Sequence, residues 1–150
     1  MPLFHVTGAN WNTGDLIQPG SWGQTLRQFR PGGPVPGSWE TVMWEVALET
    51  ARRQVAPVAP SRFNCVFVCE SEAFAIAFRD QYRPTAHLVQ VEPTDGDQTI
   101  HRGDFMLLSG NIPGQPAYVD YMTERGIAYW TSNPAPGMGE ILFDGPVRVV

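Results

Sequence analysis

The chain has 150 residues, a length that suits one compact domain (1–150) with a core of its own. Hydrophobic residues make up 43% and charged residues 17%, and the net charge of −5 sets fifteen Asp+Glu against ten cationic residues, all of them arginine. This acidic balance argues against stable, sequence-independent nucleic-acid binding, and no apolar run approaches the eighteen residues of a membrane span. The start MPLFHVTG shows neither region of a signal peptide, so we expect a cytoplasmic protein.

In chain order, the sequence predicts strands and helices separated by three loops rich in glycine and proline, at 31–38, 110–116 and 131–139. The first helix is predicted over 38–54, with Ser38 as its N-cap. Its apolar face has a helical period and consists of Trp39, Val42, Met43, Val46 and Thr50.

The second helix is predicted over 71–82, where Ser71 is a suitable cap and Phe74 and Phe78 form an i,i+4 pair on the buried side. A third helix is predicted over 115–126, with Pro116 in its first turn and Gly126 after its end.

Short β-branched or aromatic segments predict the strands, and most of them lie in the second half of the chain. They are residues 3–7, 64–69, 87–93, 104–109, 127–132, 140–144 and 146–150. About six or seven short strands and three helices that do not alternate regularly predict an α+β domain rather than a doubly wound sheet.

The two cysteines, Cys65 and Cys69, fall on one predicted strand. Four extended residues separate them by about 13 Å, which is beyond the reach of a disulfide. We therefore expect two buried free thiols in a reducing compartment.

The first candidate functional residue is His5, in an otherwise apolar strand. A lone histidine in such a strand is most often a structural residue bonded to the backbone. Here His5-Val6-Thr7-Gly8 is followed by Gly-Asp-Leu-Ile at 14–17. This pattern resembles the opening of ADP-ribosyltransferases of the His-Tyr-Glu type, and especially the rifampin ADP-ribosyltransferases, in which Tyr-His-Gly-Thr precedes a Gly-Asp-Leu.

Two further segments strengthen the resemblance. VFVCESEAFAIAF, at 66–78, resembles the strand and helix that hold the nicotinamide ring in that superfamily, with Phe67 in the position of a tyrosine. GEILF, at 139–143, resembles the strand of the catalytic glutamate, with Glu140 in that position and 131–139 as the preceding substrate-recognition loop. Segment 60–67 and the Tyr-Trp pair at 129–130 also resemble a family of short uncharacterised bacterial proteins placed near this superfamily.

The resemblance spans residues 4 to 149 and implies an ADP-ribosyltransferase-like split mixed β-sheet that uses NAD as a substrate. It implies transfer of ADP-ribose to an unidentified small molecule, nucleic acid or protein, with release of nicotinamide. Glu140 would bind the ribose 2′-hydroxyl and stabilise the positive charge that develops on the sugar. His5 would hold a ribose. The remaining cofactor contacts would come from Val6, Thr7, Phe67, Phe74 and, for the diphosphate, Arg62.

Several alternatives stay open. Asp104 is a second candidate carboxylate, because Val-Glu-Pro-Thr at 91–94 precedes it much as in the rifampin enzymes. Val6 replaces a glycine and Phe67 a tyrosine, so a binding module that has lost catalysis is the alternative function, and NAD hydrolysis is another. The histidines and cysteines lack the close paired spacing of a zinc site, so no metal is expected.

Overall fold

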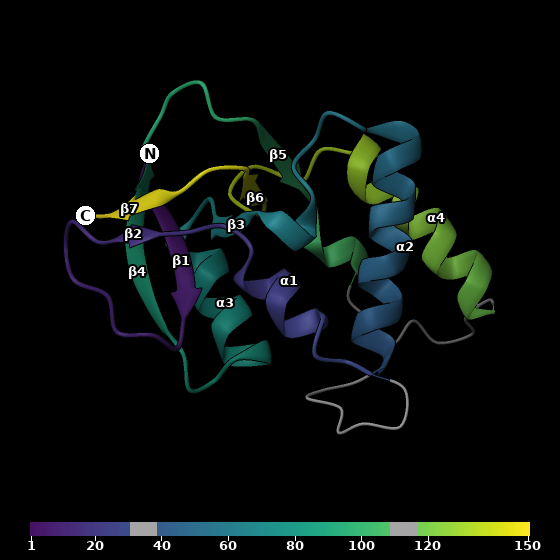
Figure 1. The fold of residues 1–150 in the computed structure, drawn as a ribbon, viewed down its shortest axis with the longest axis horizontal. Helices are drawn as coiled ribbons and strands as arrows, with labels where there is room; N and C mark the ends of the chain where they lie inside the picture. Colours follow the sequence, from purple (N-terminus) through teal and green to yellow (C-terminus); the bar gives the residue numbers. More distant parts are fainter. Residues whose placement is uncertain (31–38, 109–116) are drawn as a thin grey trace.

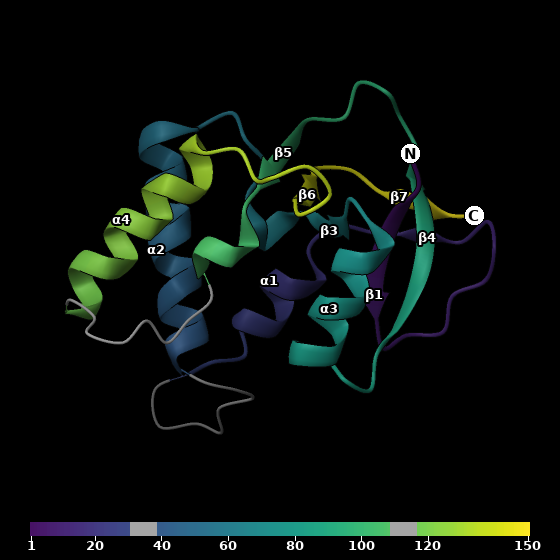
Figure 2. The ribbon, with the colours of Figure 1, turned by 180° about the vertical axis from the view of Figure 1, so that it is seen from behind.

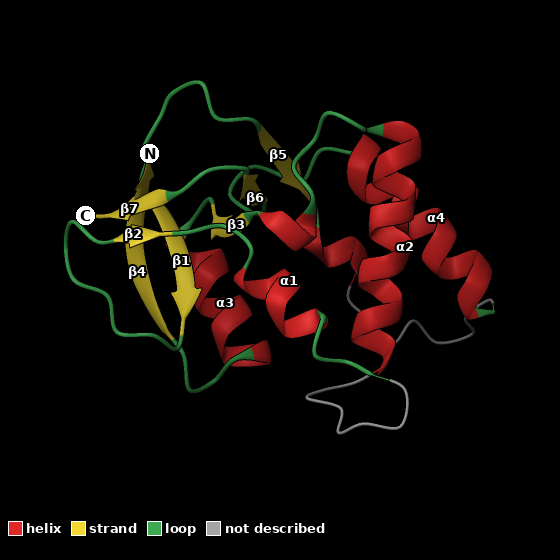
Figure 3. Cartoon of the chain, in the orientation of Figure 1, coloured by secondary structure: helices red, strands yellow, loops and turns green. Residues whose placement is uncertain are grey.

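The computed structural model describes residues 1–30, 39–108 and 117–150, and these form an α+β fold with a seven-stranded sheet, which confirms the predicted class (Figure 3). The strands are β1 (Leu3–Thr7), β2 (Leu16–Ile17), β3 (Val66–Cys69), β4 (His87–Pro93), β5 (Ile100–Gly103), β6 (Glu140–Phe143) and β7 (Val147–Val149). The helices are α1 (Ser21–Leu26), α2 (Trp39–Val55), α3 (Glu72–Tyr82) and α4 (Tyr118–Thr131), with 3₁₀ turns η1 (Arg62–Asn64) and η2 (Phe105–Leu108).

The strand order is β2-β7-β4-β1-β3-β6-β5. Every pairing between the described strands is antiparallel, so the sheet is not the mixed one that the resemblance implied. β1 meets β4 along five residue pairs but meets β3 at a single one, Phe4 with Cys69. The sheet therefore has two halves that meet at this seam, with β2, β7, β4 and β1 in one and β3, β6 and β5 in the other (Figure 1).

The two faces of the sheet have different coverings. We use the term inner face for the side of the sheet on which both halves contribute to one apolar core. This core contains Ile17, Val66, Val68, Val91, Phe143, Val147 and Val149. On the opposite side, the helix face, α3 packs against β1 and β3, while α2 and α4 cover β3 and β6 (Figure 2). Because successive side chains alternate, each strand residue belongs to one face only.

The third predicted helix is longer than expected. α4 continues through Gly126 to Thr131, so the predicted strand at 127–132 is wrong. Aromatic residues favour strands locally, but here packing against α2 decides. An ideal Cβ on Gly126 would lie 3.4 Å from the Ala47 carbonyl oxygen, and the Trp130 indole donates to the Leu48 carbonyl at 2.8 Å. The predicted loop at 110–116, with Pro116, lies outside the described residues.

The predicted strand at 104–109 is also wrong. The strand β5 ends before it, and residues 105–108 form the turn η2. The Asp104 carboxylate accepts from the Met106 backbone N–H at 3.0 Å, a local bond that competes with strand pairing. Neither β2 nor α1 was predicted, because two and six residues are too few for a recognisable period.

The first predicted helix is present, but its buried side is not the predicted one. The buried side chains of α2 are Glu45, Leu48 and Ala51, whereas Trp39 and Met43 on the predicted apolar face are about half exposed. The charged residue Glu45 faces inward, where it pairs with Arg62. The predicted cap Ser38 and the loop at 31–38 lie outside the described residues. The cap of α3 is confirmed, because the Ser71 hydroxyl accepts from the Phe74 N–H at 3.1 Å. No described helix is both long and apolar enough to cross a membrane.

Candidate functional site

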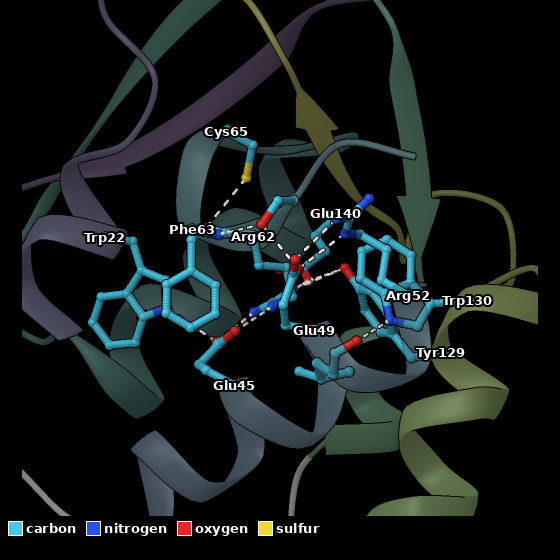
Figure 4. Close-up of polar contacts among 12 residues, drawn as sticks. Trp22, Glu45, Glu49, Arg52, Arg62, Phe63, Cys65, Tyr129, Trp130 and Glu140 are labelled. Atoms are coloured by element: carbon cyan, nitrogen blue, oxygen red, sulfur yellow. Dashed lines mark hydrogen bonds and ion pairs between the residues drawn. The ribbon is translucent and has the colours of Figure 1, made fainter. Parts of the chain in front are cut away.

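Four polar side chains meet on the helix face, where β6, η1, α2 and α4 converge (Figure 4). At the centre is Arg62, whose Nε and Nη2 donate to the two carboxylate oxygens of Glu45 at 2.9 and 3.1 Å. Its Nη1 donates to the Tyr129 hydroxyl at 2.8 Å and also to Glu140 Oε1. Tyr129 in turn donates to that same Glu140 oxygen. We call these residues the Arg62 cluster.

The Arg62 cluster lies in the interior, where none of its members is more than 6% exposed. Burial disfavours the charged form of Arg62, but Glu140 and Glu45 outweigh this and raise its pKa well above the usual value. Burial, together with Glu140, raises the pKa of Tyr129 well above its usual value, so its hydroxyl stays protonated and donates. The Arg62 cluster therefore joins β6 and α2 through the ion pairs of Arg62, and it joins α4 through the hydrogen bonds of the Tyr129 hydroxyl.

Arg62, predicted to contact a diphosphate, has protein partners instead in this structure. Its guanidinium lies between two carboxylates and also faces the rings of Phe67, at 4.7 Å, and Tyr129, at 5.1 Å. An anion cannot replace these contacts without leaving the two glutamates unpaired in the interior. In the sequence Arg62 precedes the strand predicted over 64–69, and none of its neighbours in the chain indicates that it is buried. The partner that explains its burial is 78 residues away in the chain.

A different site lies around His5. This residue lines an open cleft of about 330 Å³ on the inner-face side of β1. Its Nδ1 is 2.8 Å from the Phe67 carbonyl oxygen, and because a carbonyl only accepts, Nδ1 carries the proton. The neutral ring therefore keeps Nε2 as a hydrogen-bond acceptor. Burial lowers the pKa of His5, more than the bond to Phe67 raises it, and Arg83 lowers it further.

The rest of the cleft is uncharged. The Thr7 hydroxyl accepts from the Ala9 N–H at 3.1 Å and from the Trp11 indole at 3.2 Å, and so fixes the aromatic side of the cleft. The other lining residues come from β2, α1 and the segment between them: Leu16, Ile17, Gln18, Pro19, Ser21 and Gln24. Among the described residues that line the cleft, His5 is the only titratable one.

His5 and Glu140 do not share a cleft. His5 lies opposite Val89, which packs on the inner-face core. Glu140 lies opposite Cys69, whose side chain packs beneath α3 on the helix face. The resemblance implies that both residues contact the same NAD molecule from one cleft, and the positions of His5 and Glu140 contradict this arrangement. The reason is the strand register, since a residue's place along its strand decides which way its side chain projects.

The other predicted site residues are also divided between the His5 cleft and the helix face of the sheet. Thr7 lines the cleft with His5. Val6 and Phe74 are buried together in the core beneath α3, and the Val6 carbonyl accepts from Arg83 at 3.3 Å. Phe67 offers its carbonyl to His5, while its ring lies over Arg62. The structure thus brings Arg62, Phe67 and Glu140 together but places His5 and Thr7 elsewhere.

Asp104, the alternative carboxylate, follows β5 and lies near Arg102, whose pKa it helps to raise. It does not line the cleft. Arg102 pairs with Glu70 through both carboxylate oxygens and also donates to the carbonyls of Pro134, at 2.8 Å, and Ala135, at 3.0 Å. The Ser71 hydroxyl donates to the Gly137 carbonyl at 2.6 Å. The loop before β6 is therefore anchored at both ends.

The two cysteines are free and buried, as predicted. Burial raises the pKa of both thiols, to about 12 for Cys69, so they stay protonated. Within the part of the chain that the structure describes, no group of three His, Cys, Asp or Glu side chains is placed to hold a metal ion.

Sequence reasoning missed Glu45 and Tyr129, the two members of the Arg62 cluster that lie on helices. Glu45 lies outside the apolar face predicted for its helix, and Tyr129 lies in a segment predicted as a strand. The cleft residues of α1, Ser21 and Gln24, were missed because that helix was not predicted. The only available signal was the Gly-Asp-Leu-Ile segment, which marks β2 beside them.

Comparison with known families supplies one match. Residues 37–150 match the family described as Protein of unknown function (DUF2441). The chain belongs to this family. The matched region contains the whole Arg62 cluster, whereas His5 and the rest of the cleft precede it. No curated protein matches the chain.

Proposed function

We propose that this protein binds NAD in the cleft at His5 and acts as an NAD-binding module of ADP-ribosyltransferase type. The observation that carries the proposal is the His5 ring, held by Phe67 in the tautomer that leaves Nε2 as an acceptor. Such an acceptor suits a ribose hydroxyl, which donates. The resemblance of His-Val-Thr-Gly to transferase openings supplies the identity of the ligand.

The walls of the cleft support the same ligand. Trp11 offers an aromatic face on which a nicotinamide or adenine ring can stack. The amides of Gln18 and Gln24 both donate and accept, which matches a carboxamide. A volume of about 330 Å³ lies within the range of small-molecule sites.

The binding module is favoured over the transferase because of where Glu140 lies. Bond cleavage between nicotinamide and ribose needs a negative charge near the developing cation. Glu140 points to the other face of the sheet, and its Oε1 already accepts from Arg62 and Tyr129. Among the described lining residues of the cleft there is no Asp or Glu.

Transfer of ADP-ribose is the second candidate function, with NAD hydrolysis as its variant in which water is the acceptor. The observation in its favour is the order of elements. β3 runs directly into α3, and the loop anchored by Arg102 runs into β6, as the resemblance implies. Either function suits a cytoplasmic protein, and the two buried free thiols support that location.

The test is a calorimetric titration with NAD, run beside an assay of nicotinamide release with and without cell extract. We expect wild-type protein to bind NAD without releasing nicotinamide, and His5→Ala to weaken binding tenfold or more. Gln24→Ala should weaken it as well, whereas the matched control Gln90→Ala, on an exposed position of β4, should not.

Absence of NAD binding in the wild type would refute the proposal. Nicotinamide release that Glu140→Gln abolishes, at a temperature where the variant stays folded, would establish cleavage of NAD instead, as transfer if it needs cell extract and as hydrolysis if it does not. Equal loss of binding in Gln24→Ala and Gln90→Ala would show that the cleft is not the site.

A further inference from the structure

A second cavity, of about 200 Å³, opens between the end of α1, the side of α2 and the turn η1. Its lining residues are Arg27, Glu49, Arg53, Ser61, Phe63 and Asn64. None of them lines the His5 cleft, so the two sites are separate. We propose that this cavity binds a phosphate group, free or as an ester. The proposal does not depend on the proposed function.

Glu49, the one acidic residue among the described residues that line the cavity, is already paired with Arg52. Arg52 donates to both carboxylate oxygens of Glu49, at 2.9 and 2.8 Å, and this arginine holds the pKa of Glu49 below its usual range. The remaining amino group of Arg52 donates to the carbonyls of Pro57 and Ala59, each at 3.0 Å. Arg52 thus uses its donors inside the protein and compensates Glu49 charge for charge.

The other two arginines keep most of their donors. Arg53 makes one long contact with Glu49, at 3.3 Å, and its side chain is 74% exposed. The Arg27 guanidinium lies 5.6 Å from the centre of the Phe63 ring. Within the described residues Arg27 makes no ion pair, so the N–H groups of its guanidinium are available to bind a ligand. Arg27 and Arg53 at the cavity, with Arg52 paired to Glu49, outnumber the one glutamate by two, which leaves two positive charges unneutralised in a protein whose net charge is −5.

This arrangement selects a phosphate group. A guanidinium presents a planar fork of donors that matches two phosphate oxygens, and two such forks match the double charge of a phosphate monoester better than the single charge of a carboxylate. The Asn64 amide supplies a further donor at the wall. Phe63 closes the cavity with an aromatic surface and holds Arg27 over its ring, which reduces the freedom that binding would have to remove.

The experiment titrates inorganic phosphate and, separately, ribose 5-phosphate into the full chain at low ionic strength, with chloride as the reference anion. We expect saturable binding that Arg27→Gln and Arg53→Gln each weaken tenfold or more. The matched control is Arg148→Gln, which removes the same charge from an exposed position on β7 and should leave the affinity unchanged. Circular dichroism establishes that all three variants are folded.

The outcomes separate clearly. Tighter binding of the ester identifies a phosphorylated small molecule as the ligand, whereas tighter binding of inorganic phosphate identifies the free ion. Equal weakening in all three variants would mean that only net charge matters, and it would overturn the proposal, as would absence of saturable binding. His5→Ala should leave phosphate binding intact, so the experiment tests the phosphate site independently of the NAD cleft.

Discussion

Replacing Arg62 with leucine should destabilise the protein far more than any other arginine substitution. The change removes the only cation between Glu45 and Glu140 while both carboxylates stay buried. Breaking a buried ion pair by deleting one partner costs about 3–5 kcal/mol, because the other charge is left without compensation. In Arg62→Leu two charges lose their partner, so we expect a loss at the upper end of that range.

This loss is large compared with the total free energy of unfolding of a protein of this size. Domains of this size unfold with free energies of about 5–15 kcal/mol, and 1 kcal/mol shifts Tm by about 2–4 °C at 150 residues. Arg62→Leu should therefore lower Tm by roughly 10 °C or more. Urea unfolding followed by tryptophan fluorescence measures the change, because Trp22 donates to Glu45 at 3.0 Å and Trp130 packs beside Tyr129.

Two further variants make the reasoning refutable. Arg79→Leu breaks an ion pair with Asp80 that is partly exposed and should cost no more than about 1 kcal/mol. Combining Arg62→Leu with Glu45→Leu and Glu140→Leu removes all three charges and should recover part of the loss, since apolar side chains of similar volume can replace a buried ionic group. The recovery is not complete, because the buried Tyr129 hydroxyl loses both of its partners. A loss below 1 kcal/mol in Arg62→Leu, or no recovery in the triple variant, would refute this account.

Three other predictions follow from the contacts. Gly103→Ala places a Cβ 2.3 Å from the Tyr129 ring, so it should destabilise by about 1–3 kcal/mol, measured by urea unfolding; an unchanged midpoint would contradict the tight packing. His5 has a lowered pKa in the folded state, so the stability that its neutral form contributes is present above about pH 6.5 and declines as the pH falls through the folded pKa. NAD binding should decline over the same interval, and calorimetry that shows no pH dependence would exclude His5 as the acceptor. Arg102→Gln removes the anchor of 132–139, so amide hydrogen exchange there should accelerate at least tenfold while α3 stays protected.

The sequence was most informative where the structure is decided locally. The strand at 87–93 and the start of α3 after Ser71 were predicted at their observed positions, because alternation and capping are properties of neighbouring residues. Segment 127–132 was mispredicted because its aromatic residues favour a strand until α2 packs against them. The sequence of one segment does not show which other helix will pack against it in the folded protein.

The candidate site was harder to predict for the same reason. His5 and Glu140 were both identified as unusual polar residues on apolar strands, and each has a specific partner, Phe67 and Arg62 respectively. Their separation depends on which strand residues lie opposite each other. That register is set by pairings between distant segments, and a shift of one residue would reverse it.

The strand pairing also determines the order in which the protein can be completed during synthesis. β1 pairs only with β3 and β4, and β2 pairs with β7 near the last residues of the chain. β2 must therefore wait for its partner, which emerges from the ribosome some 130 residues later. At about 5–20 residues per second, that interval lasts about 7–26 seconds. Within these 150 residues, the segment that carries His5 and the cleft is thus made well before β7 and gains its full set of neighbours late.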